Sequence, residues 1–200
     1  ATRMSNRADA HLPLSLSLRI IIEKGAVPVL VDLCQKHASL PPAAPGAPRP
    51  RSASPSEAHI SPHRVTLLRR VTAAVTNLCH EDNDCKTLVR ECGGIPPLVK
   101  MLGLPNTYVQ MSAASALKAV AFRNEANKNL IVELNALPSI VHMLLSKNEL
   151  VHYEGIALLS NLVHSSSHIK KRVLSENALQ VKTRPARRPP RPRSPRLCSH

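Results

Sequence analysis

The chain has few aromatic residues: no tryptophan, one phenylalanine and two tyrosines among 200 residues. Proteins that read single-stranded nucleic acid or RNA stack bases on aromatic side chains, so this composition disfavours such a reader. Glycine is also scarce, with six residues, and none lies in a phosphate-cradling loop. The sequence contains neither a nucleophile motif nor a pair of carboxylates placed for acid and base catalysis. We therefore expect no enzyme.

The chain also lacks a long hydrophobic run and a regular set of cysteines. Its apolar stretch at 12–22 is too short for a membrane span and contains Arg19. No signal peptide is apparent. Five cysteines at irregular spacing fit a reducing compartment better than a disulfide framework. These features predict an intracellular protein, in the nucleus, the cytoplasm or both.

An internal repeat is the main feature that the sequence does contain. The segment GGIPPLVKML at 93–102 returns as NALPSIVHML at 135–144, and NALQ at 177–180 begins it again. The copies start 42 residues apart. A fixed period of this size indicates stacked structural units rather than one globular core. The function is therefore expected in a surface rather than in a pocket.

Each unit reads as three helices. The first is short, as at 127–134, and ends near a glycine or asparagine. The second has Pro96 or Pro138 in its first turn, where the missing N–H has no helical partner. The third is longer, at about 106–122 and 149–164, with apolar residues at helical spacing. The pattern predicts an all-α fold.

The first unit is interrupted. Its second helix is EKGAVPVLVDLC at 23–34, in which Val27 precedes Ile95 by 68 residues, 26 more than one period. The segment that follows this helix is rich in proline, alanine and serine and is expected to be disordered. The predicted organisation is an irregular N-terminus (1–13), a partial first repeat (14–36), a proline-rich disordered insertion (37–63), repeats of which the last is truncated (64–180), and a disordered tail (181–200).

The tail at 181–200 has seven basic and no acidic residues, which is half of the formal net charge of +14. One interpretation is a disordered segment that binds nucleic acid weakly and without sequence preference, or acts as a nuclear import signal. The other is a solvated tail without a role of its own, in a truncated gene product. The residues that would contact nucleic acid are Arg184, Arg187, Arg188, Arg191, Arg193 and Arg196.

Several cysteines and histidines invite comparison with a metal site. Cys79, Cys85 and Cys92 lie close in sequence, but their spacing matches no zinc-finger pattern. We interpret them as small buried packing residues. His164 and His168 flank a run of serines that indicates a turn between units, so they are not expected to share a helix face. The sequence predicts no metal and no cofactor.

Three helices per period, with the phrase "G/N-A/G-I/L-P-x-L/I-V-x-x-L" opening the second, resemble the armadillo repeat. HEAT repeats have a similar length but normally two helices, and are the nearest alternative. Stretches such as RRVTAAVTNLCHEDNDCKTLVRECGGIPPLVKML and NKNLIVELNALP are similar to the armadillo part of plant and algal armadillo-BTB/POZ proteins. The resemblance covers 64–180 well and 19–35 loosely, and nothing in the chain resembles a BTB/POZ domain. It implies a right-handed armadillo α-solenoid of about three repeats, as an incomplete array.

In the resembled family the third helices line a concave groove, and an asparagine near the end of each one bonds the backbone of a partner peptide. Asn77 and Asn161 match that position, whereas Ala119 interrupts the row. The alternative is that these asparagines bond to their own helix ends. Import receptors of this superfamily also use tryptophan on that face, which is absent here. The candidate partner-binding residues are Asn77, Asn161, Met111, Ser115, Lys118, Tyr153, Ala157 and Arg69.

The basic residues on the same helices influence the expected partner. Arg69, Arg70, Lys118 and Arg123 would suit an acidic or phosphorylated peptide, or they form an ordinary solvated face. The sequence thus predicts a non-enzymatic protein-interaction module that binds an extended or helical partner segment. The resemblance implies a relation to adaptors that recruit substrates such as transcription factors to a cullin-based ubiquitin ligase.

Overall fold

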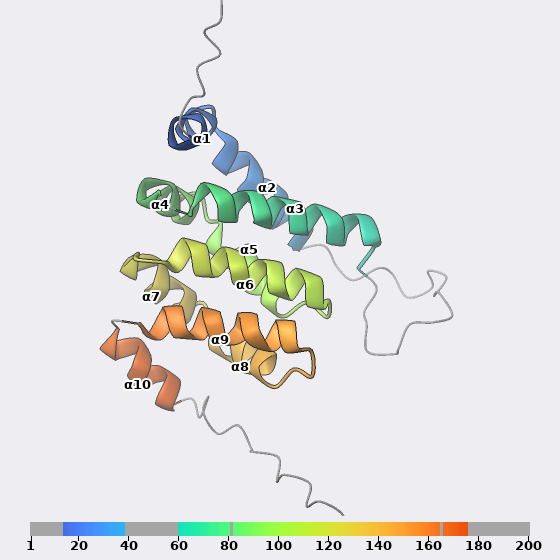
Figure 1. The fold of residues 1–200 in the computed structure, drawn as a ribbon, viewed down its shortest axis with the longest axis vertical. Helices are drawn as coiled ribbons and strands as arrows, with labels where there is room; N and C mark the ends of the chain where they lie inside the picture. Colours follow the sequence, from blue (N-terminus) through green and yellow to red (C-terminus); the bar gives the residue numbers. More distant parts are fainter. Residues whose placement is uncertain (1–13, 39–59, 81, 165, 176–200) are drawn as a thin grey trace, which may run out of the picture.

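The structure, a computed structural model, consists of helices stacked along one direction (Figure 1). It describes residues 14–38, 60–80, 82–164 and 166–175, with side chains from residue 19 onward. The described residues contain helices and no strand, as predicted. The helices are α1 (Leu14–Glu23), α2 (Ala26–Ala38), α3 (Pro62–Leu78), α4 (Asn83–Glu91), α5 (Ile95–Leu102), α6 (Thr107–Ala121), α7 (Glu125–Glu133), α8 (Leu137–Leu144), α9 (Glu149–Val163) and α10 (Ser167–Ser175).

The helices repeat with the period of the sequence. The short first helices α4, α7 and α10 begin at residues 83, 125 and 167, and the long helices α6 and α9 begin at 107 and 149. Three units of three helices result, α1 to α3, α4 to α6 and α7 to α9, followed by α10. The predicted three-helix unit is thus confirmed, although the first helix of the third unit begins two residues before the predicted Asn127.

Side-chain caps explain where the helices begin. Asp82 accepts hydrogen bonds from the first turn of α4, and Asn124 does the same for α7. Asn106 and Asn148 cap α6 and α9. Such caps use backbone N–H groups that have no partner within the helix. The sharp stops after α4 and α7 use left-handed backbone at Gly93 (φ 72°) and Asn135 (φ 59°), residues that tolerate this conformation.

The third helices α3, α6 and α9 lie side by side and form one continuous layer (Figure 1). The second helices α2, α5 and α8 pack against them from the other side. The core runs between these layers through the whole stack rather than gathering in one centre, as expected for a solenoid. Its largest fully buried side chains include Leu68, Leu98, Leu117, Ile140 and Leu158.

Two buried lysines, one period apart, make matching hydrogen bonds at the ends of the third helices. Lys86 Nζ in α4 donates a 2.9 Å hydrogen bond to the carbonyl oxygen of Phe122, just after α6. Lys128 in α7, one period later, donates at 2.8 Å to the carbonyl oxygen of His164, just after α9. Each ammonium group meets the negative end of a helix dipole, a favourable placement for a cation. The 42-residue repeat therefore includes buried charged residues as well as apolar ones.

The boundaries of the predicted insertion need correction. His37 and Ala38 still belong to α2, and Pro62 already begins α3, so the helices extend into the predicted range 37–63 at both ends. Ser61 caps α3, and Pro62 occupies its first turn, where proline is favoured. Arg64 Nε also donates a 2.7 Å hydrogen bond to the carbonyl oxygen of His37, which joins the two helix ends. The rest of the predicted insertion, 39–59, and the predicted disordered tail lie outside the described residues.

Candidate functional site

The third helices present a shared exposed surface, which we call the third-helix face. It consists of residues on the side of α3, α6 and α9 that faces away from the second helices. Three rows of residues recur on it at the 42-residue period. All of their members are exposed or half-buried. The rows are Arg69, Met111 and Tyr153; Ala73, Ser115 and Ala157; and Asn77, Ala119 and Asn161.

The three rows include every predicted partner-binding residue except Lys118. Lys118 is half-buried and lies next to Ala119 in the sequence, so we count it as part of the face. The large side chains of the face gather over α6 and α9. Tyr153 is 66% exposed, and Met111, one period earlier, is half-buried. One helical turn before them lie Tyr108 (58% exposed) and Leu150 (62% exposed), again one period apart. We call Tyr108, Met111, Leu150 and Tyr153 the apolar patch.

Sequence reasoning missed Tyr108 and Leu150. Each precedes a predicted contact residue, Met111 or Tyr153, by three positions, a spacing that places both side chains on one face of a helix. The signal was therefore present in the same periodicity that identified the other rows.

The charges of the face are unevenly distributed. Neither α3 nor α6 contains an acidic residue. Arg69 and Arg70 are exposed on α3, and the Arg69 guanidinium lies 5.2 Å from the centroid of the Tyr108 ring, within range of a cation–π interaction. On α9, by contrast, Glu149 and Glu154 introduce negative charge. The face is thus cationic at its α3 end.

Lys118, predicted to contribute to the basic character of this surface, is paired with an acidic residue. Its Nζ lies 3.2 Å from Glu154 Oε2, and both side chains are partly shielded from solvent. Its carbonyl oxygen accepts a 2.9 Å hydrogen bond from Asn161 Nδ2. Lys118, Glu154 and Asn161 therefore tie α6 to α9. Arg123 likewise stacks on a neighbouring ring, 5.1 Å from the centroid of Phe122.

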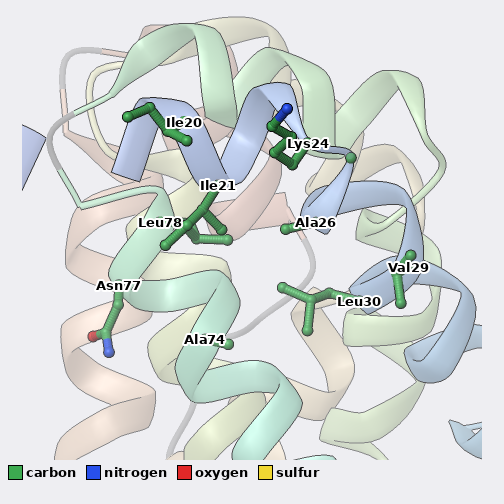
Figure 2. Close-up of a pocket in the computed structure, with 10 residues that line it drawn as sticks. Ile20, Ile21, Lys24, Ala26, Val29, Leu30, Ala74, Asn77 and Leu78 are labelled. Atoms are coloured by element: carbon green, nitrogen blue, oxygen red, sulfur yellow. The ribbon is translucent and has the colours of Figure 1, made fainter. Parts of the chain in front are cut away.

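The two predicted asparagines differ in their surroundings. The side-chain amide of Asn161 donates its hydrogen bond to Lys118 in the preceding third helix and not to the end of its own helix. Asn77 is exposed, and its side chain makes no hydrogen bond to the residues that the structure describes. Figure 2 shows its amide turned away from the apolar side chains of α1. Of the two, Asn77 has the amide available for another chain.

An open depression of about 610 Å³ lies beside Asn77, between the C-terminal end of α3 and helices α1 and α2 (Figure 2). Its lining is mainly apolar and includes Ile21, Val29, Ala74 and Leu78. The residue one period after Ala74 is Ala116, which is fully buried. The depression therefore corresponds to positions that are covered inside the stack.

Four of the five cysteines lie in the described part of the chain. Among the described residues, no group of three or more histidine, cysteine, aspartate or glutamate side chains could hold a metal ion. Cys79 and Cys85 are buried, as predicted, and Cys92 is half-buried. The sulfur atoms of Cys79 and Cys85 lie 3.6 Å apart, a proximity that the sequence interpretation did not foresee. Helix α9 ends at Val163 and α10 begins at Ser167, so His164 and His168 do not share a helix face, as predicted.

The six tail arginines proposed to contact nucleic acid lie outside the described residues, so that alternative stays a prediction. In the described part of the chain, each helix is too short or too polar to cross a membrane.

Comparison with known proteins agrees with this architecture. Residues 82–118 match the family model of the armadillo/beta-catenin-like repeat. A designed armadillo repeat protein in complex with the peptide (KR)4 superimposes with a TM-score of 0.64 at 21% identity, covering 82% of this chain and 58% of that one. An armadillo-repeats-only protein from Plasmodium falciparum gives a TM-score of 0.53 at 18% identity, covering 82% and 64%. The fold is an armadillo solenoid.

Known proteins also share part of this sequence. The chain is 44% identical over 92 residues to an Arabidopsis thaliana protein named "ARM repeat protein interacting with ABF2", covering 46% of this chain and 10% of that protein. It is 33% identical over 108 residues to the juxtamembrane domain-associated catenin of Caenorhabditis elegans, covering 52% and 8%. The chain thus spans about a tenth of the length of these relatives. Armadillo repeats generally mediate protein–protein interactions and typically serve as non-enzymatic scaffolds.

Proposed function

We propose that the third-helix face binds a segment of a partner protein. The observation that carries this proposal is the apolar patch, in which three exposed side chains and the half-buried Met111 lie on two neighbouring helices of one continuous layer. Tyr108, Leu150 and Tyr153 are each more than half exposed. Clustered exposed aromatic and aliphatic side chains are a typical feature of interaction surfaces. The patch supplies contact area, while the rows of small residues beside it leave room for a chain.

The charge distribution suggests the chemistry and direction of the partner. Arg69 and Arg70 lie at the α3 end, and Lys118 is neutralised by Glu154 nearer α9. A segment with acidic or phosphorylated residues at one end and apolar residues at the other would fit, with its acidic end over α3. Asn77 would add hydrogen bonds to its backbone. Asn161, Ser115 and Ala157 would border the segment rather than anchor it.

A role in substrate recruitment would follow from such binding. We include in the proposal that the partner is a transcription factor or another substrate delivered to a cullin-based ubiquitin ligase by a related full-length adaptor. The name of the Arabidopsis relative, which refers to an interaction with ABF2, supports a protein partner. The charge of the face here calls for a peptide of opposite sign to the (KR)4 peptide held by the designed repeat protein.

Selection from a library of random 12-residue peptides displayed on phage tests the proposal. We expect enrichment of peptides with Asp or Glu toward one end and aromatic or aliphatic residues toward the other. For an enriched peptide, Tyr153→Ala should weaken binding about tenfold, as for a residue at the centre of an interface. Arg69→Gln should weaken it less and remove most of its salt dependence.

The matched control is His142→Ala, which removes an exposed side chain from α8, outside the third-helix face. It should leave peptide affinity unchanged. Equal losses for His142→Ala and Tyr153→Ala would place the binding site elsewhere. Enrichment of basic peptides would contradict the proposed partner chemistry while leaving the site open to test by the same variants.

A further inference from the structure

Cys79 and Cys85 bring two thiols together at the junction of the first and second units. Cys79 is the C-terminal cap residue of α3, and Cys85 lies in the first turn of α4. Both side chains are buried, and their sulfur atoms are 3.6 Å apart. A disulfide has an S–S distance of about 2.05 Å. The sulfurs are thus one short movement from bonding.

This pair is not a requirement of the repeat. The residues one period later are Ala121 and Asn127, both fully buried in a junction of the same architecture. Asn127 joins its neighbours through hydrogen bonds to the carbonyl oxygens of Lys86 and Val120. Alanine and asparagine therefore satisfy the fold at these two positions, and two thiols are a feature of the first junction.

The surroundings make the two thiols unequal. The sulfur atoms share a hydrogen bond in which either thiol can donate. This contact lowers the pKa of Cys85, although burial opposes this shift, and raises the pKa of Cys79. Of the neighbouring charges, Asp82 raises the pKa of Cys85 and Lys86 lowers it to a smaller extent. Burial raises the pKa of Cys34, by contrast, to about 11. Cys85 is thus the thiol in this environment with the greater thiolate character.

Cys85 is buried but borders a depression that is open to solvent. Cys85 forms part of the wall of an open depression of about 390 Å³. Its lining also includes Arg19 and Glu23 from α1 and Asp82 and Thr87 at the start of α4. Reactive cysteines combine thiolate character with access of this kind.

We propose that Cys79 and Cys85 form a reversible redox pair that reduces a hydroperoxide and becomes a disulfide. The Cys85 thiolate attacks the O–O bond of hydrogen peroxide, hydroxide leaves, and Cys85 becomes a sulfenic acid. The Cys79 sulfur then attacks the Cys85 sulfur. The S–S bond forms, and the sulfenic hydroxyl leaves as water with the proton of Cys79. Two thiols lose two electrons, and one peroxide yields two waters. An external dithiol reverses the reaction.

The disulfide would join the end of α3 directly to the start of α4. Asn77, the exposed asparagine of the third-helix face, lies two residues before Cys79. Oxidation would therefore restrain the end of α3 at that face. This inference does not depend on the proposed function, since the redox pair can be tested without a partner.

Peroxide treatment of the full chain, followed by alkylation under denaturing conditions and mass spectrometry, tests the proposal. Trypsin cleaves after Arg70 and Lys86, so both cysteines fall in one peptide, 71–86. We expect this peptide to escape alkylation and to lose 2 hydrogen masses, about 2 Da, as two thiols become a disulfide. Dithiothreitol should restore alkylation. Cys34 should remain alkylated, because its raised pKa keeps it a thiol.

Variants that introduce the residues of the next unit separate the roles. Cys79→Ala should retain a sulfenic acid on Cys85 that reacts with dimedone, and Cys85→Asn should remove both that adduct and the disulfide. Cys34→Ala is the control and should oxidise like the wild type. Circular dichroism verifies that each variant is folded. Full alkylation of 71–86 in the peroxide-treated wild type, or disulfides mainly with Cys34, Cys92 or Cys198, would overturn the proposal.

Discussion

The junction between the first and second units and the junction between the second and third have the same helices in the same places, but different atoms hold them. At the later junction Asn127 is fully buried and donates 3.0 Å hydrogen bonds to two carbonyl oxygens, of Lys86 in α4 and of Val120 in α6. At the earlier junction the matching residue is Cys85, and its sulfur contacts Cys79. The period thus fixes where helices lie, while individual residues decide how firmly neighbouring units are joined.

The junctions also differ in the space that they leave at the start of the second helix. A Cβ atom placed on Gly94 would lie 2.8 Å from Val89 Cγ1 and 2.9 Å from Val31 Cγ2. One period later Ala136 occupies this position with its methyl group fully buried. The earlier junction therefore packs backbone closer to its neighbours, and the later one replaces this contact with a side chain.

Removing the buried amide should have the largest effect. Asn127→Ala should lower the free energy of unfolding by about 3 kcal/mol, because two buried carbonyl oxygens and the Arg90 guanidinium each lose a hydrogen-bond partner. Cys85→Ala, the matched change, should cost about 1 kcal/mol, since it removes mainly packing. Urea unfolding under reducing conditions measures both. Equal losses would mean that the two junctions are held with similar strength after all.

Exchanging glycine and alanine at the start of the second helices should have a smaller effect. The added methyl group would crowd its neighbours at position 94, and the removed one would leave space at position 136. Gly94→Ala should cost about 2 kcal/mol, because Val31 and Val89 must move. The reverse change, Ala136→Gly, should cost about 1 kcal/mol through lost packing and greater backbone freedom. Thermal unfolding of both variants and the wild type provides the comparison. A stabilised Gly94→Ala protein would show that the earlier junction has room for a methyl group.

The fold was largely predictable because the 42-residue period links local signals with packing. The apolar spacing recurs where α5 and α8 form, and so does a proline in the first turn, Pro96 in α5 and Pro138 in α8. The predicted helix ends are less accurate where they rest on composition rather than on capping residues. Proline-rich sequence suggested an insertion up to residue 63, but Ser61 and Pro62 together are a helix-start signal.

The candidate site was predictable in position but not in its interactions. The periodic rows placed Arg69, Met111 and Tyr153 on one exposed face. The neutralisation of Lys118 could not be inferred in the same way, because Glu154 lies 36 residues away on another helix. Its pairing depends on how α6 and α9 stack. Whether these residues contact a partner stays a prediction.

The interactions that cross the third-helix face should have the smallest effects and differ in their response to salt. The contact from α6 to α9 includes the Lys118–Glu154 ion pair, whereas that from α3 to α6 has Arg69 over the Tyr108 ring. Glu154→Gln keeps the shape of the side chain and should cost at most about 1 kcal/mol, because the pair is partly solvated.

That loss should shrink in 1 M salt, where the screening length falls to about 3 Å. Tyr108→Leu should also cost less than about 1 kcal/mol, and most of this cost should persist in salt, because the ring contributes packing as well as attraction to the cation. Urea unfolding at low and high salt separates the two. If both losses vanish in salt, charge alone distinguishes these contacts. If neither changes, the two third-helix contacts depend on packing, and the differences between the junctions lie beneath the face, at Asn127 and Cys85.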